Sequence, residues 1–318
     1  NGSGFFTDES ATRIPQFAMS SAHCSFGDVD DDGDLDLWFT RGGSSRFGSG
    51  QAQLWINDGA GFYTNETASR LPAQLVSEPM DCIFGDLDGD LDLDMLEGHR
   101  AGNSKLYRND GGIFVDITAG NLPGDSNTYS YDLGDLDGDG DLDVFGANSG
   151  VGSREAVFQN NGAGSFTNVT STVLPNSSNP NVDDNDSKFF DSDNDGDLDV
   201  FYTNWDASQS YTTNNIRYLE NTGNAYNPFF VERFGLNNPV DTITAIENIA
   251  FVDIDGDGDM DMFGSQLFYN PREFYYYENT GTASAAAYSL QTGTNNPLDS
   301  VIHHQNILEP TSPISNAM

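Results

Sequence analysis

The sequence predicts an all-β protein built from repeated four-stranded antiparallel sheets, and three observations lead to this fold class. A nine-residue stretch with aspartate at every second position recurs five times in the 318 residues. A turn rich in asparagine and glycine follows each stretch, and short apolar runs flank both. No long helical period is present. Units of about 40–50 residues with four strands each are the signature of β-propeller blades.

The five stretches, called the aspartate loops below, occupy residues 28–36, 86–94, 135–143, 191–199 and 253–261. Aspartates fill positions 1, 3, 5, 7 and 9 of each loop: Asp28, Asp30, Asp32, Asp34 and Asp36; Asp86, Asp88, Asp90, Asp92 and Asp94; Asp135, Asp137, Asp139, Asp141 and Asp143; Asp191, Asp193, Asp195, Asp197 and Asp199; Asp253, Asp255, Asp257, Asp259 and Asp261. Carboxylates crowded in this way repel one another unless a cation lies among them. Calcium accepts about six to eight oxygens in flexible geometry, whereas magnesium demands a tighter octahedron. The loops therefore predict calcium sites.

A second motif marks a hairpin within each unit. The first aspartates of successive loops are 58, 49, 56 and 62 residues apart. Turn sequences begin between them at Asn57, Asn109, Asn160, Asn221 and Asn279. The Asn-Asp-Gly and Asn-Asn-Gly sequences of the first three favour positive φ, as tight hairpin turns require. Each unit therefore reads as strand, calcium loop, strand, connection, strand, turn and strand.

The repeats predict one propeller domain over residues 1–318, with five complete repeats and two partial ones at 1–8 and 296–318. Residues 1–8 repeat the hairpin turn and last strand of a unit. Residues 296–299 match 238–241, but Thr311 lies where a sixth loop would begin. We expect six or seven blades when the ring is complete. The partial ends would share one blade or leave edges for another subunit.

The loops and their flanks resemble a known family. Phe26-Gly27-Asp28, Phe84-Gly85-Asp86 and Leu133-Gly134-Asp135 each precede a loop, and the hairpin turn follows. This arrangement is similar to the FG-GAP and VCBS repeats of integrin α-subunit propellers and secreted microbial proteins. The resemblance implies an extracellular propeller with a role in adhesion or recognition. It also implies that calcium is held by the side chains at positions 1, 3, 5 and 9 and by the main-chain carbonyl at position 7.

Position 6 separates the second loop from the others. Glycine there permits a sharp turn in four loops, whereas the second loop carries Leu91. A leucine at positive φ is strained. We therefore expect calcium in four loops and weaker binding in the loop of residues 86–94. An EF-hand is disfavoured because strands, not helices, flank the loops. The apolar residue at position 8 is expected to anchor each loop in the core.

Composition disfavours several function classes. The net charge is −38 and only 12 residues are Lys or Arg, so no basic surface is available for nucleic acid or anionic membranes. No apolar run is long enough to span a bilayer.

The histidines at 23, 99, 303 and 304 form no catalytic set. We expect His23 to make a buried hydrogen bond and His99-Arg100 to lie on a connection. We therefore expect no enzyme.

The remaining features bear on recognition and export. Cys24 and Cys82 allow a disulfide, but equivalent side chains of successive repeats point the same way, which favours two buried thiols.

The connections at 41–51, 97–104, 148–155 and 203–215 are candidate binding loops. Trp205, Tyr211 and the tyrosines at 275–277 are candidate sugar platforms, although the tyrosine run favours strand packing, as do Trp38 and Trp55. Candidate glycosylation sites of a glycoprotein are Asn65, Asn168, Asn176 and Asn185.

The sequence thus predicts a secreted or cell-surface propeller, stabilised by calcium, that binds or assembles. The first expectation is cell adhesion or a structural role in an extracellular assembly or filament, with protein partners or identical subunits at unpaired blade edges. A lectin-like carbohydrate-binding propeller is the alternative. A propeller domain of a polysaccharide-degrading enzyme is the third.

Overall fold

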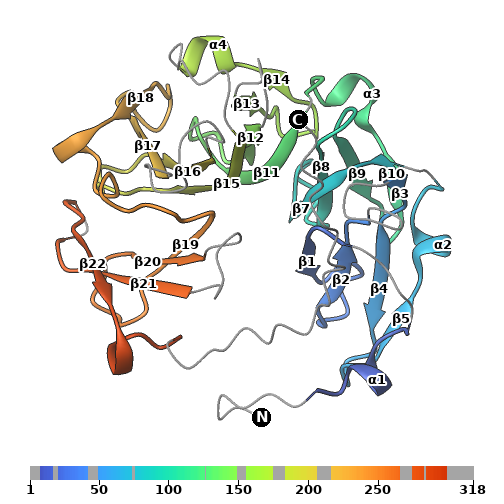
Figure 1. Cartoon of the computed structure of the whole chain (residues 1–318). Coiled ribbons are helices and arrows are strands. Elements are labelled where there is room, and N and C mark those ends of the chain that lie inside the picture. Colours follow the sequence, from blue (N-terminus) through green and yellow to red (C-terminus); the bar gives the residue numbers. More distant parts are fainter. Residues whose placement is uncertain are drawn as a thin grey trace, which may run out of the picture.

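In the computed structural model, five antiparallel sheets of four strands each follow one another around a common axis (Figure 1). The structure describes residues 8–16, 21–41, 49–73, 76–125, 127–148, 155–174, 183–205, 216–265, 274–282 and 284–298. The predicted all-β propeller with five complete repeats is confirmed. A sixth or seventh blade stays a prediction, because residues 1–7 and 299–318 lie outside the described residues.

The strands of each blade occur in the predicted order. The first blade contains β1 (Cys24–Gly27), β2 (Asp36–Phe39), β4 (Gln53–Asn57) and β5 (Tyr63–Asn65). The second contains β7 (Pro79–Gly85), β8 (Asp94–His99), β9 (Lys105–Asn109) and β10 (Phe114–Asp116). The third contains β11 (Thr128–Gly134), β12 (Asp143–Asn148), β13 (Ala156–Gln159) and β14 (Thr167–Asn168). The fourth contains β15 (Asp183–Phe190), β16 (Asp199–Trp205), β17 (Ile216–Asn221) and β18 (Phe230–Arg233). The fifth contains β19 (Asn248–Val252), β20 (Asp261–Ser265), β21 (Phe274–Asn279) and β22 (Tyr288–Gln291).

A few short elements lie outside the blades. Strands β3 (Ser49–Gly50) and β6 (Val76–Ser77) pair with each other. The helices are α1 (Ser10–Arg13), α2 (Thr67–Arg70), α3 (Thr118–Asn121) and α4 (Thr170–Val173), with 3-10 turns η1 (Gly235–Asn237) and η2 (Gly293–Asn295). None of the helices in the described ranges combines membrane-spanning length with an apolar sequence.

The first strand of every blade lies nearest the axis, and the fourth lies at the rim (Figure 1). Each aspartate loop joins the first strand to the second, and the antiparallel register closes it. Gly27 pairs with Asp36 in the first blade and Gly85 with Asp94 in the second. All five loops therefore emerge at the same end of the axis, while the connections from second to third strands lie at the opposite end.

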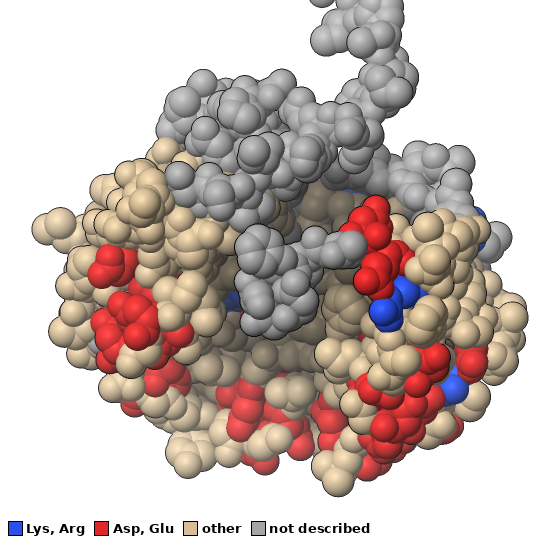
Figure 2. Space-filling view, turned by 90° about the horizontal axis from the view of Figure 1, so that it is seen from below, with Lys and Arg blue, Asp and Glu red and all other residues tan. Residues whose placement is uncertain are grey.

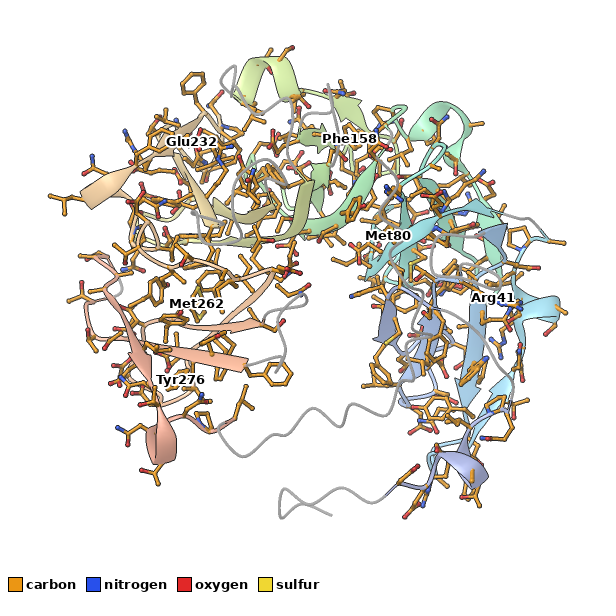
Figure 3. The ribbon with its side chains drawn as sticks, in the orientation of Figure 1. Arg41, Met80, Phe158, Glu232, Met262 and Tyr276 are labelled. Atoms are coloured by element: carbon orange, nitrogen blue, oxygen red, sulfur yellow. The ribbon has the colours of Figure 1, made fainter. Side chains whose placement is uncertain are left out.

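The hydrophobic cores lie between blades. Trp38 of the first blade is fully buried, and its ring centroid lies 5.1 Å from that of Phe114 and 5.5 Å from that of Tyr107 in the second. Three further clusters join the second blade to the third, the third to the fourth and the fourth to the fifth. Phe158 and Met262, both labelled in Figure 3, are fully buried members of these clusters. The predicted core positions of Trp38 and Trp55 are confirmed.

The glycine that precedes a loop permits close contact between neighbouring blades. A Cβ atom on Gly27 would lie 2.9 Å from the ring of Phe84 and 3.0 Å from Leu93 of the second blade. Gly85 and Gly134 meet the next blade in the same way. A side chain at these positions would force the blades apart. This spacing accounts for the glycine that follows an apolar residue before each of the first three loops.

The expectation that position 8 anchors each loop in the core is confirmed only in part. Leu142 and Leu198 are partly buried and pack against the clusters between blades. Leu93 at this position packs on the glycine of the preceding blade and is only partly buried. Leu35 is 55% exposed and Met260 is 42% exposed. Position 2 is the better anchor, because Val29 is only 2% exposed and Leu87 only 1%.

Among the described residues, no neighbouring blade covers one face of the first blade and one face of the fifth. Phe26 is 56% exposed, whereas its equivalent Phe84 packs on the first blade. Ile254 of the fifth blade is 45% exposed, whereas its equivalent Val29 is buried. In Figure 1 these two blades lie on either side of an opening in the ring of described sheets.

Candidate metal centres

Backbone hydrogen bonds shape every aspartate loop in the same way. The carboxylate at position 1 accepts a hydrogen bond from the N–H group of position 6, at 2.9 Å from Gly33 to Asp28 and 3.0 Å from Gly140 to Asp135. The other three loops repeat this contact. The carboxylate at position 5 accepts from the N–H group of position 7 in each loop. Each turn therefore folds its own carboxylates toward one point.

Three carboxylates in each loop place one oxygen each within 4.8 Å of one another. The groups are Asp28, Asp30 and Asp32; Asp86, Asp88 and Asp94; Asp135, Asp137 and Asp143; Asp191, Asp193 and Asp195; and Asp253, Asp255 and Asp257. Positions 1 and 3 belong to every group. Position 5 completes three groups and position 9 completes two. In the view of Figure 2, acidic side chains gather in separate patches along the lower side of the molecule.

Buried carboxylate oxygens in all five loops lack a hydrogen-bond donor among the described residues, at position 7 in the fourth and fifth loops (Asp197 and Asp259) and at position 3 in the other three. The Oδ1 atoms of Asp30, Asp88 and Asp137, all at position 3, are buried and accept no hydrogen bond from the described part of the chain. The other oxygen of Asp30 lies 2.9 Å from Nη2 of Arg70, which orients this carboxylate. A buried oxygen without a donor costs free energy unless a cation takes its lone pair. The residues present therefore fit a divalent cation with oxygen ligands.

The electrostatics of the loops agree with this fit. Burial, followed by repulsion from the neighbouring aspartate, raises the pKa of Asp88 and of Asp137. Burial raises the pKa of Asp94 and of Asp143 to about 7. The charged form of these groups is therefore disfavoured without a cation, and a divalent ion would offset that cost.

Position 9 links three parts of each blade. Asp36 accepts hydrogen bonds from the N–H groups of Val29 at 3.1 Å and Asn57 at 2.8 Å. In the other four blades the carboxylate at position 9 also accepts hydrogen bonds from the N–H group of position 2 and from the N–H group of the asparagine that begins the hairpin turn. All five carboxylates are between 0% and 2% exposed. Each carboxylate oxygen keeps a second lone pair, so these bonds leave a ligand role open.

Side chains at position 7 belong to none of the five groups. Oδ2 of Asp92 instead accepts a hydrogen bond from the N–H group of Gly111 in the hairpin turn, at 2.9 Å. The carboxylates of Asp34 and Asp141 lie against turn glycines 59 and 162. The predicted ligand at position 7 is the carbonyl group, and this assignment stays a prediction.

Leu91 adopts the strained conformation expected from the sequence. Its φ is 75°, close to the values of 91° and 92° at the equivalent glycines 33 and 140. Its side chain is 84% exposed, so no packing offsets the strain. The second loop nevertheless brings three carboxylates together like the others. Strands flank all five loops, which excludes the helix-loop-helix arrangement of an EF-hand.

Two expectations about histidines were wrong. The His23 side chain is 50% exposed rather than buried, and its Nδ1 lies 3.0 Å from Oδ1 of Asp81. His99 is only 2% exposed at the end of β8 rather than on a connection, and its Nε2 lies 3.4 Å from Oε1 of Glu97. The backbone of Arg100 donates to the carbonyl of Glu78. Histidines 303 and 304 lie outside the described residues.

Other predicted residues are placed with mixed outcomes. Both cysteines are free thiols as favoured, but only Cys82 is buried, and Cys24 is exposed. Tyr276 is 5% exposed in β21, so strand packing is confirmed there. Asn65 and Asn168 are exposed on rim strands, while Asn176 lies outside the described residues. Tyr211 and most of the candidate binding loops at 41–51, 148–155 and 203–215 also lie outside them.

The role of the turn asparagines was not predicted from the sequence. Asn109 and Asn160 are buried, and each donates from Nδ2 to the carbonyl group of position 2 in the preceding blade, Val29 or Leu87, at 2.8 Å. Their recurrence at a fixed place after each loop is the signal that could have shown it. The turns of the second and third blades therefore support the aspartate loop of the preceding blade.

Sequence comparison identifies the repeats. The model of FG-GAP-like repeats matches residues 98–146, 138–202 and 191–264. No curated protein sequence matches the chain.

Two solved structures are similar to the chain at low identity. The crystal structure of Bap1, a biofilm matrix protein of V. cholerae, has a TM-score of 0.45 and 14% identity, over 87% of this chain and 39% of that chain. The chain thus spans well under half the length of Bap1. A thermostable family-43 glycoside hydrolase has a TM-score of 0.46 and 9% identity, over 87% of this chain and 96% of that one.

Proposed function

Because the chain belongs to the family of FG-GAP-like repeat proteins, we propose that it is an extracellular, calcium-stabilised propeller that serves as an adhesion, recognition or assembly module. One observation carries the proposal. Five loops at the same place in five blades each bring three carboxylates within 4.8 Å. Calcium at the roughly millimolar concentration found outside cells saturates sites of modest affinity.

In this proposal calcium is structural. The ion would be held by side chains at positions 1, 3, 5 and 9, and it would offset the repulsion among them. The carboxylate at position 9 also accepts hydrogen bonds from N–H groups of the loop and of the hairpin turn. In the third blade, Asp143 accepts them from Leu136 and Asn160. Metal binding would therefore fix the first three strands of a blade together and contribute folding free energy.

The number of bound ions tests this role. After chelation and dialysis into about 1 mM calcium, elemental analysis should find about four to five ions per chain. Asp137→Asn should remove about one, because position 3 of the third loop loses its charge. Asp116→Asn is the matched control, since Asp116 pairs with Lys105 outside the loops. An unliganded chain under these conditions, or equal losses in both variants, would reject the proposal.

Assembly with a second copy of the chain is proposed through the two uncovered blade faces. Phe26 and Leu35 of the first blade are more than half exposed, although their equivalents pack against a neighbouring blade. Ile254 lies on one face of the fifth blade. In the inner blades, the equivalent face packs against the residues of the next blade that are equivalent to Phe26 and Leu35. The two faces are thus complementary, and a head-to-tail contact between copies would bury both.

Sedimentation velocity at rising concentration tests the assembly. We expect association that Phe26→Ser weakens and that Phe234→Ser leaves unchanged, since Phe234 is 63% exposed and follows the rim strand of the fourth blade. A chain that stays monomeric at every concentration contradicts this part of the proposal and leaves the calcium role intact.

A further inference from the structure

One position of the repeat lines a pocket on the propeller axis. The residue five places before each aspartate loop is polar in all five blades. These residues, called the axial ring, are His23, Asp81, Ser130, Asp186 and Asn248. All five line one pocket of about 490 Å³. The first strands lie nearest the axis (Figure 1). The ring residues lie at or near the starts of these strands, whereas the aspartate loops follow their ends, so the pocket lies toward the end of the axis opposite the loops.

Two carboxylates of the ring are fixed by the neighbouring blade. Oδ2 of Asp81 accepts the N–H group of Tyr131 at 2.6 Å, and Oδ2 of Asp186 accepts that of Ile249 at 2.8 Å. Their other oxygens contact nitrogen atoms of side chains in the pocket wall. Oδ1 of Asp186 lies 2.6 Å from Nζ of Lys188, and Oδ1 of Asp81 lies 3.0 Å from Nδ1 of His23. The charged groups are therefore held in place before any ligand arrives.

The wall offers donors and acceptors side by side. Lys188 and Asn248 donate, the carboxylates of Asp81 and Asp186 accept, and the hydroxyl of Ser130 does both. Met80, labelled at the start of β7 in Figure 3, and Tyr129 add apolar surface. The volume lies within the range of small-molecule sites, about 300–1,000 Å³.

The combination of donors, acceptors and apolar surface in the pocket wall favours one class of ligand over others. An anion would face Asp81 and Asp186, and a bare cation would face Lys188. A neutral molecule with several hydroxyl groups can donate to the carboxylates and accept from Lys188 and Asn248 at the same time. Its apolar C–H face would lie against Tyr129 and Met80. We propose that the axial pocket binds a neutral sugar unit. This inference gives the proposed recognition module a ligand and in that sense rests on the proposed function.

Ligand-observed NMR of the full chain in saturating calcium tests the inference. The probes are free glucose, galactose, mannose and N-acetylglucosamine, followed by calorimetry for any sugar that binds. His23→Ala and Asn248→Ala should each weaken binding by about tenfold, as loss of one hydrogen-bonding group does. Ser289→Ala is the control, because Ser289 is exposed on β22 at the rim of the blade that carries Asn248. Melting curves of the variants should match the parent chain.

Several outcomes would overturn the inference. These are no binding of any of the four sugars, binding that survives both ring substitutions, and binding of lysine methyl ester alone, which would show a site for cations. The calcium proposal is separable from these results. A chain whose melting depends on calcium but that binds no sugar loses only the pocket inference. A chain that binds sugar through the ring without any calcium effect loses only the calcium role.

Discussion

The side-chain amide of Asn109 donates a hydrogen bond to the carbonyl oxygen of Val29 in the preceding blade, at 2.8 Å. Both residues are buried. Val29 is position 2 of the first aspartate loop, and Asn109 begins the hairpin turn of the second blade. Its Oδ1 also accepts from Gly112, and its N–H group donates to Asp94. One asparagine therefore connects a loop, a turn and the next loop, so the candidate metal centres are coupled through the blade interfaces.

Asn109→Ala should lower the free energy of unfolding by about 2 kcal/mol, because the buried carbonyl of Val29 loses its donor. Urea unfolding in saturating calcium measures this. Asn103→Ala is the control, since Asn103 is exposed in the same blade. Equal stability of the two variants would show that the contact between blades contributes nothing.

Leu91→Gly should stabilise the chain by about 1 kcal/mol, because glycine adopts a φ of 75° without strain. It should also strengthen metal binding by the second loop. Leu236→Gly is the matched control, since Leu236 is fully exposed and has a negative φ. Thermal unfolding with and without calcium compares them. A Leu91→Gly chain that is less stable than the parent would contradict the strain argument.

Asp132 gives a pH dependence of stability. Burial raises its pKa to about 6, against the attraction of Lys188. Because the pKa of Asp132 is higher in the folded chain than in the unfolded chain, its charge lowers the free energy of unfolding above pH 6. This loss of stability disappears as the pH falls from about 6 toward 4. Asp132→Asn should therefore stabilise the chain by about 1–2 kcal/mol at pH 8 and by much less near pH 4.

Denaturant unfolding across this pH range, in saturating calcium so that the loop carboxylates stay liganded, measures the difference. Asp110→Asn is the control, because a hydrogen bond from Arg108 lowers the pKa of Asp110. A constant difference between Asp132→Asn and the parent at all pH values would contradict the assignment.

Spacing predicted much of this fold. The regular spacing of the aspartate loops and asparagine turns predicted where the four strands of each blade lie. The strain at Leu91 was predicted because this loop has leucine at the position where the other four have glycine. Spacing did not say which face of a blade a residue meets. Leu35 and Leu93 occupy the same position, yet within the described part of the chain only Leu93 has a preceding blade to pack on. Its environment is set by the neighbouring repeat rather than by its own.

In the sequence the axial ring is only a recurring polar position, and its role was not predicted for a related reason. His23, Asp81 and Asn248 share a place in the repeat but no chemistry, so no motif connects them. Only the packing of first strands around the axis brings them into one pocket. The histidines were misjudged because strand ends, where exposure changes within one or two residues, are poorly defined by pattern alone.

Thermal unfolding of the full chain in about 2 mM calcium and in excess chelator tests the central claim, that bound calcium holds the blades together. Binding to several loops should raise the melting temperature by more than about 10 °C, because each saturated site adds to the free energy of unfolding. Magnesium at the same concentration should give a much smaller rise. A melting temperature that is the same with calcium and with chelator would contradict the account.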